Sequence, residues 1–202
     1  MTTATLNASA ATGPRTMRSR LAGLPFVTRK AKAKRAPKAS DYLMTPVTRT
    51  IVSLACFTMT FACLYALARA AMGHVADLSA YAKLPVWIHI AAVLPAVPLG
   101  GYLLLAKKGT ARHKQLGKVW LVLMLVTATS AIFIKTNGGF SPIHIFVPIT
   151  FHAAWKVVAT ARRGDIAAHK RHLVSTYLFA LMIPGIASFA IPGRLMNAML
   201  LG

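Results

Sequence analysis

The sequence is almost devoid of acidic side chains. Its 202 residues contain no glutamate and only three aspartates, which are far apart along the chain: Asp41, Asp77 and Asp165. Glycoside hydrolysis needs a pair of neighbouring carboxyl groups, and two-metal carboxylate sites need a cluster of them. The composition therefore argues against both classes of enzyme.

Cysteine is also scarce, with only Cys56 and Cys63 in the whole chain. Two cysteines cannot form a disulfide framework or a cysteine-rich zinc site. Seven positions are about two turns of an α-helix, so the two thiols are expected to share one helix face. We predict that both are small residues that fill a hydrophobic core.

Basic and hydrophobic residues, by contrast, are abundant. The chain has 24 Lys and Arg residues and a net charge of +21, yet 56% of its residues are hydrophobic and its mean hydropathy is +0.57. Its 13% of charged residues compares with roughly 25% in an average soluble protein. High charge favours a polyanion-binding protein, whereas high hydropathy favours a membrane protein.

The distribution of apolar residues decides between these two classes. They form five blocks, which predict membrane spans at about 50–68, 84–106, 117–134, 140–161 and 171–193. A helix needs about 20 apolar residues to cross a bilayer, and lipid leaves no water to satisfy an unpaired backbone. We therefore predict an all-α integral membrane bundle of five transmembrane helices, over 47–202.

The basic residues predict the orientation of this bundle. With the N-terminus in the cytoplasm, 20 Lys and Arg residues lie inside and four lie outside, namely Arg69, Lys83, Lys135 and Arg194. Cytoplasmic loops of membrane proteins carry the excess of positive charge. We expect a multi-pass protein of the bacterial inner membrane, with the C-terminus outside. An organellar membrane is the alternative, because the basic first segment has no acid before Asp41 and is similar to a transit peptide.

Residues 1–46 differ in kind from the rest. They are rich in Ala, Thr, Ser and Pro, and they contain a basic run at 29–35. Such a composition predicts a disordered cytoplasmic tail that lies near anionic lipid headgroups. Nucleic-acid binding is not expected, because no aromatic residues that stack on bases interleave the charges of this run.

Several local patterns support the five-helix prediction. Thr110 and Asp165 precede predicted helices and are suitable N-caps. Gly100-Gly101 is interpreted as a packing or turn element. Four aromatic residues near the span ends fit an aromatic belt at the membrane surface: Tyr81, Trp87, Tyr102 and Trp120.

The histidines are the remaining candidates for a functional site. Ionisable groups are costly inside a membrane, so those that occur there usually have a function. The predicted topology places six of the seven in two layers. The outer layer has His89 on the second span and His144 or His152 on the fourth. The inner layer has three histidines at the starts of the third and fifth helices: His113, His169 and His172.

Pairs of histidines on facing helices can hold a haem iron from both sides. We predict that His89 with His152 holds an outer haem b (with His144 as the alternative ligand), and that His113 with His169 holds an inner one. The protein would then carry electrons across the membrane, with a quinol or a small redox protein as its partner. Three basic residues near the inner layer are candidates to pair with haem propionates: Lys107, Lys114 and Arg171.

Two other interpretations use the same residues. A histidine in a membrane helix often only bonds a neighbouring helix, and the protein would then be a non-catalytic scaffold, accessory subunit or sensor. Imidazoles also bind zinc, which would allow a membrane zinc hydrolase. Such an enzyme usually needs a carboxylate as well, and the predicted topology places Asp77 and Asp165 on opposite sides of the membrane.

Four segments carry a resemblance to a known family. They are the Trp-Ile-His sequence ending at His89, the stretch 107–120 around His113, the Phe-His-Ala-Ala-Trp sequence around His152, and the Arg-Gly-Asp-Ile-Ala-Ala-His-Lys-Arg-His sequence that contains His169 and His172. From His89 to about Arg194 the chain resembles the bacterial membrane-protein family catalogued as domain of unknown function 2306. It departs from the family pattern at Lys114, where arginine is usual, and at His172, where an aromatic residue is usual.

This resemblance implies the fold and the topology. The two-layer placement of histidines is also similar to the di-haem cytochrome b-561 type, in which helices two and four hold one haem and helices three and five the other. That second similarity is architectural, so it implies haem chemistry only by analogy.

Overall fold

The computed structural model describes residues 44–75, 78–135, 139 and 141–201, and the helices among them belong to one compact unit, Pro37–Gly202. The described residues are largely helical and form no β-strand. The predicted disordered tail, 1–46, lies almost wholly outside the described residues, as does Asp77.

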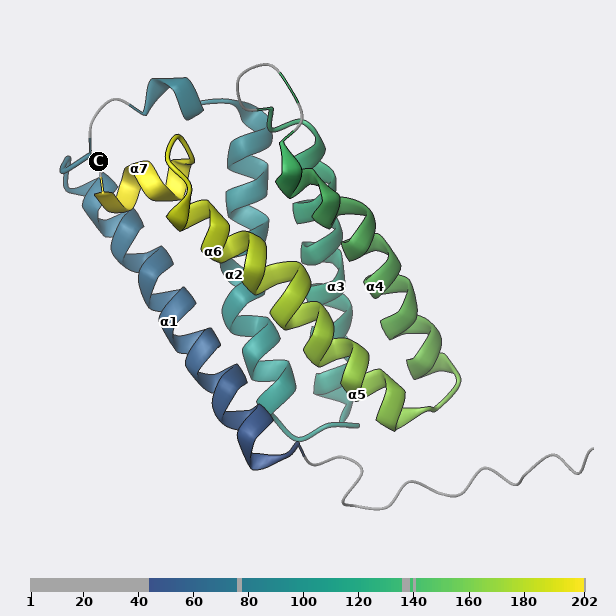
Figure 1. Cartoon of the computed structure of the whole chain (residues 1–202). Coiled ribbons are helices and arrows are strands. Elements are labelled where there is room, and N and C mark those ends of the chain that lie inside the picture. Colours follow the sequence, from purple (N-terminus) through teal and green to yellow (C-terminus); the bar gives the residue numbers. More distant parts are fainter. Residues whose placement is uncertain (1–43, 76–77, 136–138, 140, 202) are drawn as a thin grey trace, which may run out of the picture. The chain divides into compact units, whose positions relative to one another are not determined.

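Five long helical segments make up the bundle (Figure 1), and all five are long and apolar enough to cross a membrane. They are α1 (Pro46–Ala71), α2 (Leu84–Leu105), α3 (Ala111–Ile132), the 3₁₀ turn η4 (Pro142–Ile145) with α4 (Phe146–Arg162), and α5 (Ile166–Ser175) with η5 (Thr176–Met182) and α6 (Ile183–Ala190). Consecutive segments run in opposite directions, which confirms the predicted all-α membrane fold.

Two short helices were not predicted from the sequence. These are η3 (Ser79–Tyr81), which precedes α2, and α7 (Leu195–Leu201), which packs against α1. Both lie at the end of the bundle where α1 finishes (Figure 1). We call this the distal end, and we call the opposite end, where α1 starts, the basic end.

Hydroxyl and carboxylate caps fix where the helices start. Thr110 Oγ1 accepts a hydrogen bond from the backbone N–H of His113 at 3.1 Å, and Asp165 Oδ1 accepts one from Ala168 at 3.0 Å. Both predicted caps are thereby confirmed. They start α3 and α5 several residues before the apolar blocks begin, so His113 and His169 lie within helices.

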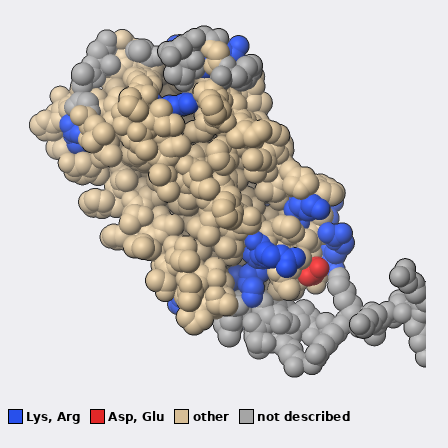
Figure 2. Space-filling view, in the orientation of Figure 1, with Lys and Arg blue, Asp and Glu red and all other residues tan. Residues whose placement is uncertain are grey.

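Lys and Arg side chains gather at the two ends of the bundle, with a broad zone of other residues between them (Figure 2). Large apolar side chains in that zone point outward, such as Phe57 at 71% exposure and Leu54 at 62%. Outward-facing apolar side chains are what a bundle surrounded by lipid requires.

The centre of the bundle is built around Gly100 and Gly101 of α2. A Cβ atom on Gly100 would lie 2.6 Å from Trp120 Nε1, and one on Gly101 would lie 2.3 Å from Cys56 Sγ. The predicted packing role of this glycine pair is therefore confirmed. The aromatic-belt prediction is wrong for Trp120, which is only 1% exposed because the missing Cβ atoms let its ring enter the core.

The two large polar aromatics of this core donate hydrogen bonds to α2. Trp120 Nε1 donates to the carbonyl of Ala96 at 3.0 Å, and the Tyr177 hydroxyl donates to that of Val97 at 3.1 Å. Tyr177 lies in η5, a π-helical stretch that precedes Pro184. Proline has no N–H for the preceding turn, and a wider turn is one way to accommodate that loss. The fifth span is thus interrupted by a π-helix just before Pro184.

Candidate functional site: a histidine-lined cavity at the distal end

The bundle contains a partly open cavity of about 780 Å³ towards its distal end. Residues of α1, α2, α3, α4, α6 and α7 line it, and most of them are apolar, among them Val93, Met124, Val147 and Phe189. The volume falls within the roughly 300–1,000 Å³ typical of small-molecule and cofactor sites. We call this space the distal cavity.

His89 of α2 lines the distal cavity and is held in one orientation. Its Nδ1 lies 3.0 Å from the carbonyl oxygen of Thr127 and 3.1 Å from Ser130 Oγ. A carbonyl oxygen only accepts, so Nδ1 carries the proton and the neutral ring keeps a lone pair on Nε2. Metal-ligating histidines are usually oriented by such a bond from the other ring nitrogen.

His144 of η4 lines the same cavity. Its Nδ1 lies 3.1 Å from the backbone nitrogen of Ser141 and 3.0 Å from the carbonyl oxygen of Ser141. These two contacts need opposite tautomers, since Nδ1 must accept from the N–H but must donate to the carbonyl. Only the second tautomer leaves a lone pair on Nε2, so iron ligation by His144 would select it.

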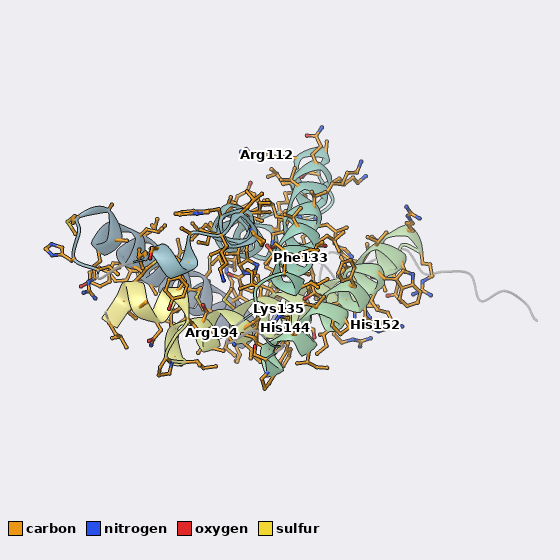
Figure 3. The ribbon with its side chains drawn as sticks, turned by 90° about the horizontal axis from the view of Figure 1, so that it is seen from above. Arg112, Phe133, Lys135, His144, His152 and Arg194 are labelled. Atoms are coloured by element: carbon orange, nitrogen blue, oxygen red, sulfur yellow. The ribbon has the colours of Figure 1, made fainter. Side chains whose placement is uncertain are left out.

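Three cationic side chains complete the lining: Lys83, Lys135 and Arg194. The cavity lining contains no Asp or Glu among the residues that the structure describes. Arg194 donates a hydrogen bond to Ser141 Oγ at 2.8 Å, which links it to the turn that carries His144. Figure 3, seen from above, places Lys135, His144 and Arg194 close together.

Sequence reasoning missed these three cations as site residues, because it used them only to count charges on the outer side. A signal was nevertheless present. Only four of the 24 Lys and Arg residues were assigned to that side, where they have no role in orientation, and three of them line the distal cavity.

His152 lies elsewhere. It is exposed, with its ring centroid 5.8 Å from that of Trp155, and Figure 3 shows it apart from His144. It lines a separate groove of about 420 Å³ with His172 and Lys156, between α4 and the α5–η5 segment. We call this the lipid-facing groove. The structure thus brings His89 together with His144, the alternative partner, and not with His152.

Histidines also meet at the basic end. His169 Nδ1 lies 3.0 Å from the carbonyl oxygen of Val157, and His113 is near enough for its charge to interact with that of His169. His113 Nδ1 is buried and has no hydrogen-bond partner among the described residues. The predicted inner pair therefore lies close together, whereas His172 faces the lipid-facing groove.

The surroundings of this inner pair are strongly basic. Lys108, in the α2–α3 connection, donates to the carbonyl of Leu104 at 2.8 Å. Burial lowers the pKa of Lys108, and the charges of Lys170 and Arg49 lower it further. Repulsion between cations from three parts of the chain makes this end attractive to anions.

No group of three or more His, Cys, Asp or Glu side chains that could hold a metal ion occurs within the described ranges. Pairs of histidines remain, and these suit a cofactor that supplies its own equatorial ligands, as haem does. The zinc-hydrolase interpretation gains no support from the arrangement of these residues.

Comparison with known families settles the relationship of the chain. The family model described as "Predicted membrane protein (DUF2306)" matches residues 86–191, which is 106 of the 202 residues. The chain belongs to this family. The matched region contains all six candidate histidines, three of the five spans in full, and a fourth, Leu84–Leu105, except for its first two residues. Searches of curated proteins and of solved structures gave no match. The similarity to the di-haem cytochrome b-561 type stays an architectural analogy.

Proposed function

We propose that this membrane protein binds haem b in the distal cavity and carries electrons through the membrane. The observation that supports the proposal best is the fixed ring of His89. Its Nδ1 proton is held by the Thr127 carbonyl, so Nε2 of a cavity-lining ring keeps the lone pair that an iron ligand would need. His144, in the tautomer that donates to the Ser141 carbonyl, would be the second ligand.

The other lining residues fit the same ligand. A porphyrin is a large apolar ring with two carboxylates at one edge, and the distal cavity combines apolar walls with cationic side chains. Lys83, Lys135 and Arg194 are the candidates to pair with the propionates. The sequence suggested no cation for this site, because Lys107, Lys114 and Arg171 were suggested for the inner layer.

Haem, when bound, supplies one-electron redox chemistry, and the protein supplies its orientation and electrostatic surroundings. The inner pair, His113 and His169, is proposed as a second haem site. Two sites at opposite ends of the bundle would let electrons pass between the two faces of the membrane. A quinol or a small redox protein is the proposed donor, and the N-terminus is proposed to face the cytoplasm of a bacterial cell.

A titration tests the proposal directly. Apoprotein purified in detergent is titrated with haem b, and the Soret absorbance is followed. The proposal expects saturation at one or two equivalents, with a low-spin bis-histidine spectrum. A linear response without saturation would instead favour the non-catalytic scaffold, accessory subunit or sensor.

A further inference from the structure

The lipid-facing groove contains three ionisable side chains that belong to membrane-spanning segments. Its lining includes His152, Lys156 and His172, together with the hydroxyl side chains of Ser175 and Thr176. Both walls belong to segments that are long and apolar enough to span a bilayer. An ionisable residue in such a segment is costly unless it has a polar partner.

Lys156 shows this most clearly. Its Nζ lies 4.9 Å from the centroid of the Trp155 ring, and this cation–π contact stabilises the charge only in part. Asp165 is the one acid among the described residues, and it is exposed at the α4–α5 turn, where its Oδ1 caps α5. The chain has almost no carboxylates, so an anion from outside the chain is the natural partner of Lys156.

The depth of these groups indicates which anion. Lys156 is six residues before the end of α4 at Arg162, and His172 is six residues after the start of α5 at Ile166. Six residues of helix rise about 9 Å, so both side chains lie near the boundary between headgroups and hydrocarbon at the basic end. Phospholipid phosphates lie just outside this boundary, within reach of a long lysine side chain.

We propose that the lipid-facing groove binds an anionic phospholipid, with its phosphate at Lys156 and His172 and an acyl chain along Pro148 and Ile149. Pro148 and Ile149 are exposed apolar residues in the same groove, which free phosphate would leave uncovered. Basic pockets between membrane helices are known sites for lipid headgroups. This inference uses residues outside the distal cavity and stands whether or not haem is bound there.

Trp155 provides the probe. The full-length protein is placed in phosphatidylcholine vesicles that contain a small, equal mole fraction of brominated phosphatidylglycerol or brominated phosphatidylcholine, and tryptophan quenching is compared. One lysine near a membrane surface enriches an anionic lipid about fivefold. We expect an enrichment of that order at wild-type Trp155. It should be lost in Lys156→Gln, reduced in His172→Gln, and retained in the control Lys118→Gln, which alters an exposed lysine of α3.

Trp155→Phe identifies the part of the emission that reports on the groove, and circular dichroism establishes that each variant is folded. Equal quenching by the two lipids would overturn the proposal and show that Lys156 only extends to the surface. Enrichment that survives in Lys156→Gln would also overturn it. A third outcome would also overturn the proposal: enrichment that is lost when inorganic phosphate is added, but kept when sulfate of the same ionic strength is added. The groove would then bind free phosphate and not a lipid.

Discussion

The distal cavity and the lipid-facing groove each contain two histidines and at least one cation, but the protein encloses them differently. His89 in the cavity is fixed by a backbone carbonyl and a hydroxyl group, and apolar walls surround it. His152 in the groove is exposed and contacts an aromatic ring. These surroundings, and not depth in the membrane helix alone, make His89 the better candidate ligand. Its ring is oriented by a partner on the second ring nitrogen, as in known metal sites.

Replacing the fixed histidine should have the largest effect. His89→Ala removes the proposed iron ligand, and we expect haem retention in the distal cavity to fall by about 100-fold or more, given that loss of an outer-shell partner alone costs 10–100-fold. Haem at the inner pair should remain. The measurement is the pyridine haemochrome content per purified protein. His152→Ala is the matched control in the groove and should retain haem at the wild-type level. Equal losses of haem in the two variants would show that the distal cavity and the lipid-facing groove do not differ in haem binding.

Substitution in the packed core around Gly100 and Gly101 should have the next largest effect, in this case on stability. Gly101→Ala places a Cβ atom 2.3 Å from Cys56 Sγ, and overpacking of this kind costs about 1–3 kcal/mol. Gly117→Ala in α3 meets nothing within 4 Å and should be neutral or slightly stabilising. Unfolding in mixed detergent micelles measures both. A Gly101→Ala protein as stable as Gly117→Ala would contradict the close packing of α1 on α2.

Removing a cation from the distal cavity should weaken haem binding less than removing the ligand His89 does. Arg194→Gln removes a cation that lines the distal cavity and bonds Ser141, and we expect about tenfold weaker haem binding, since one hydrogen bond to a charged group contributes about 1.5–3 kcal/mol. Arg112→Gln changes an exposed arginine at the basic end and serves as the control. Binding constants from Soret titrations compare the two, and a loss as large in Arg112→Gln would point to net charge alone.

The smallest effect is expected from the hydroxyl partner of His89. Ser130→Ala removes one contact to Nδ1 but leaves the Thr127 carbonyl in place, so haem affinity should fall only a few-fold. Ser175→Ala in the lipid-facing groove should change nothing at the haem. Haem dissociation to apomyoglobin measures both variants, and a loss as large as that of His89→Ala would show that the carbonyl does not fix the ring.

Much of the fold could be predicted from the sequence, because apolar blocks separated by basic turns leave a bilayer few alternatives. Thr110 and Asp165 cap helices as expected, and Gly100-Gly101 packs as expected. The short helix α7 was missed because its seven residues follow directly on the fifth apolar block. Trp120 was misplaced because a position near a span end does not show which face of the helix is buried.

The candidate site was predictable only in part. The sequence placed both His144 and His152 on the fourth span, with His152 eight residues deeper, and could not choose between their helix faces. On an α-helix, two side chains eight positions apart, as His144 and His152 are, point about 80° apart around the helix axis. His144 lies in the 3₁₀ turn η4, where the rotation per residue differs, so the angle changes again. The cationic lining was missed because Lys83, Lys135 and Arg194 belong to three separate connections that meet only in the folded bundle.

A difference spectrum shows most directly whether the distal cavity holds a histidine-ligated haem. The full-length protein is expressed in haem-replete cells, purified in mild detergent, and measured reduced minus oxidised. We expect a b-type α-band in the wild-type protein and in His152→Ala, with the distal contribution absent from His89→Ala. A colourless wild-type protein, or an α-band that is unchanged in His89→Ala, would contradict it.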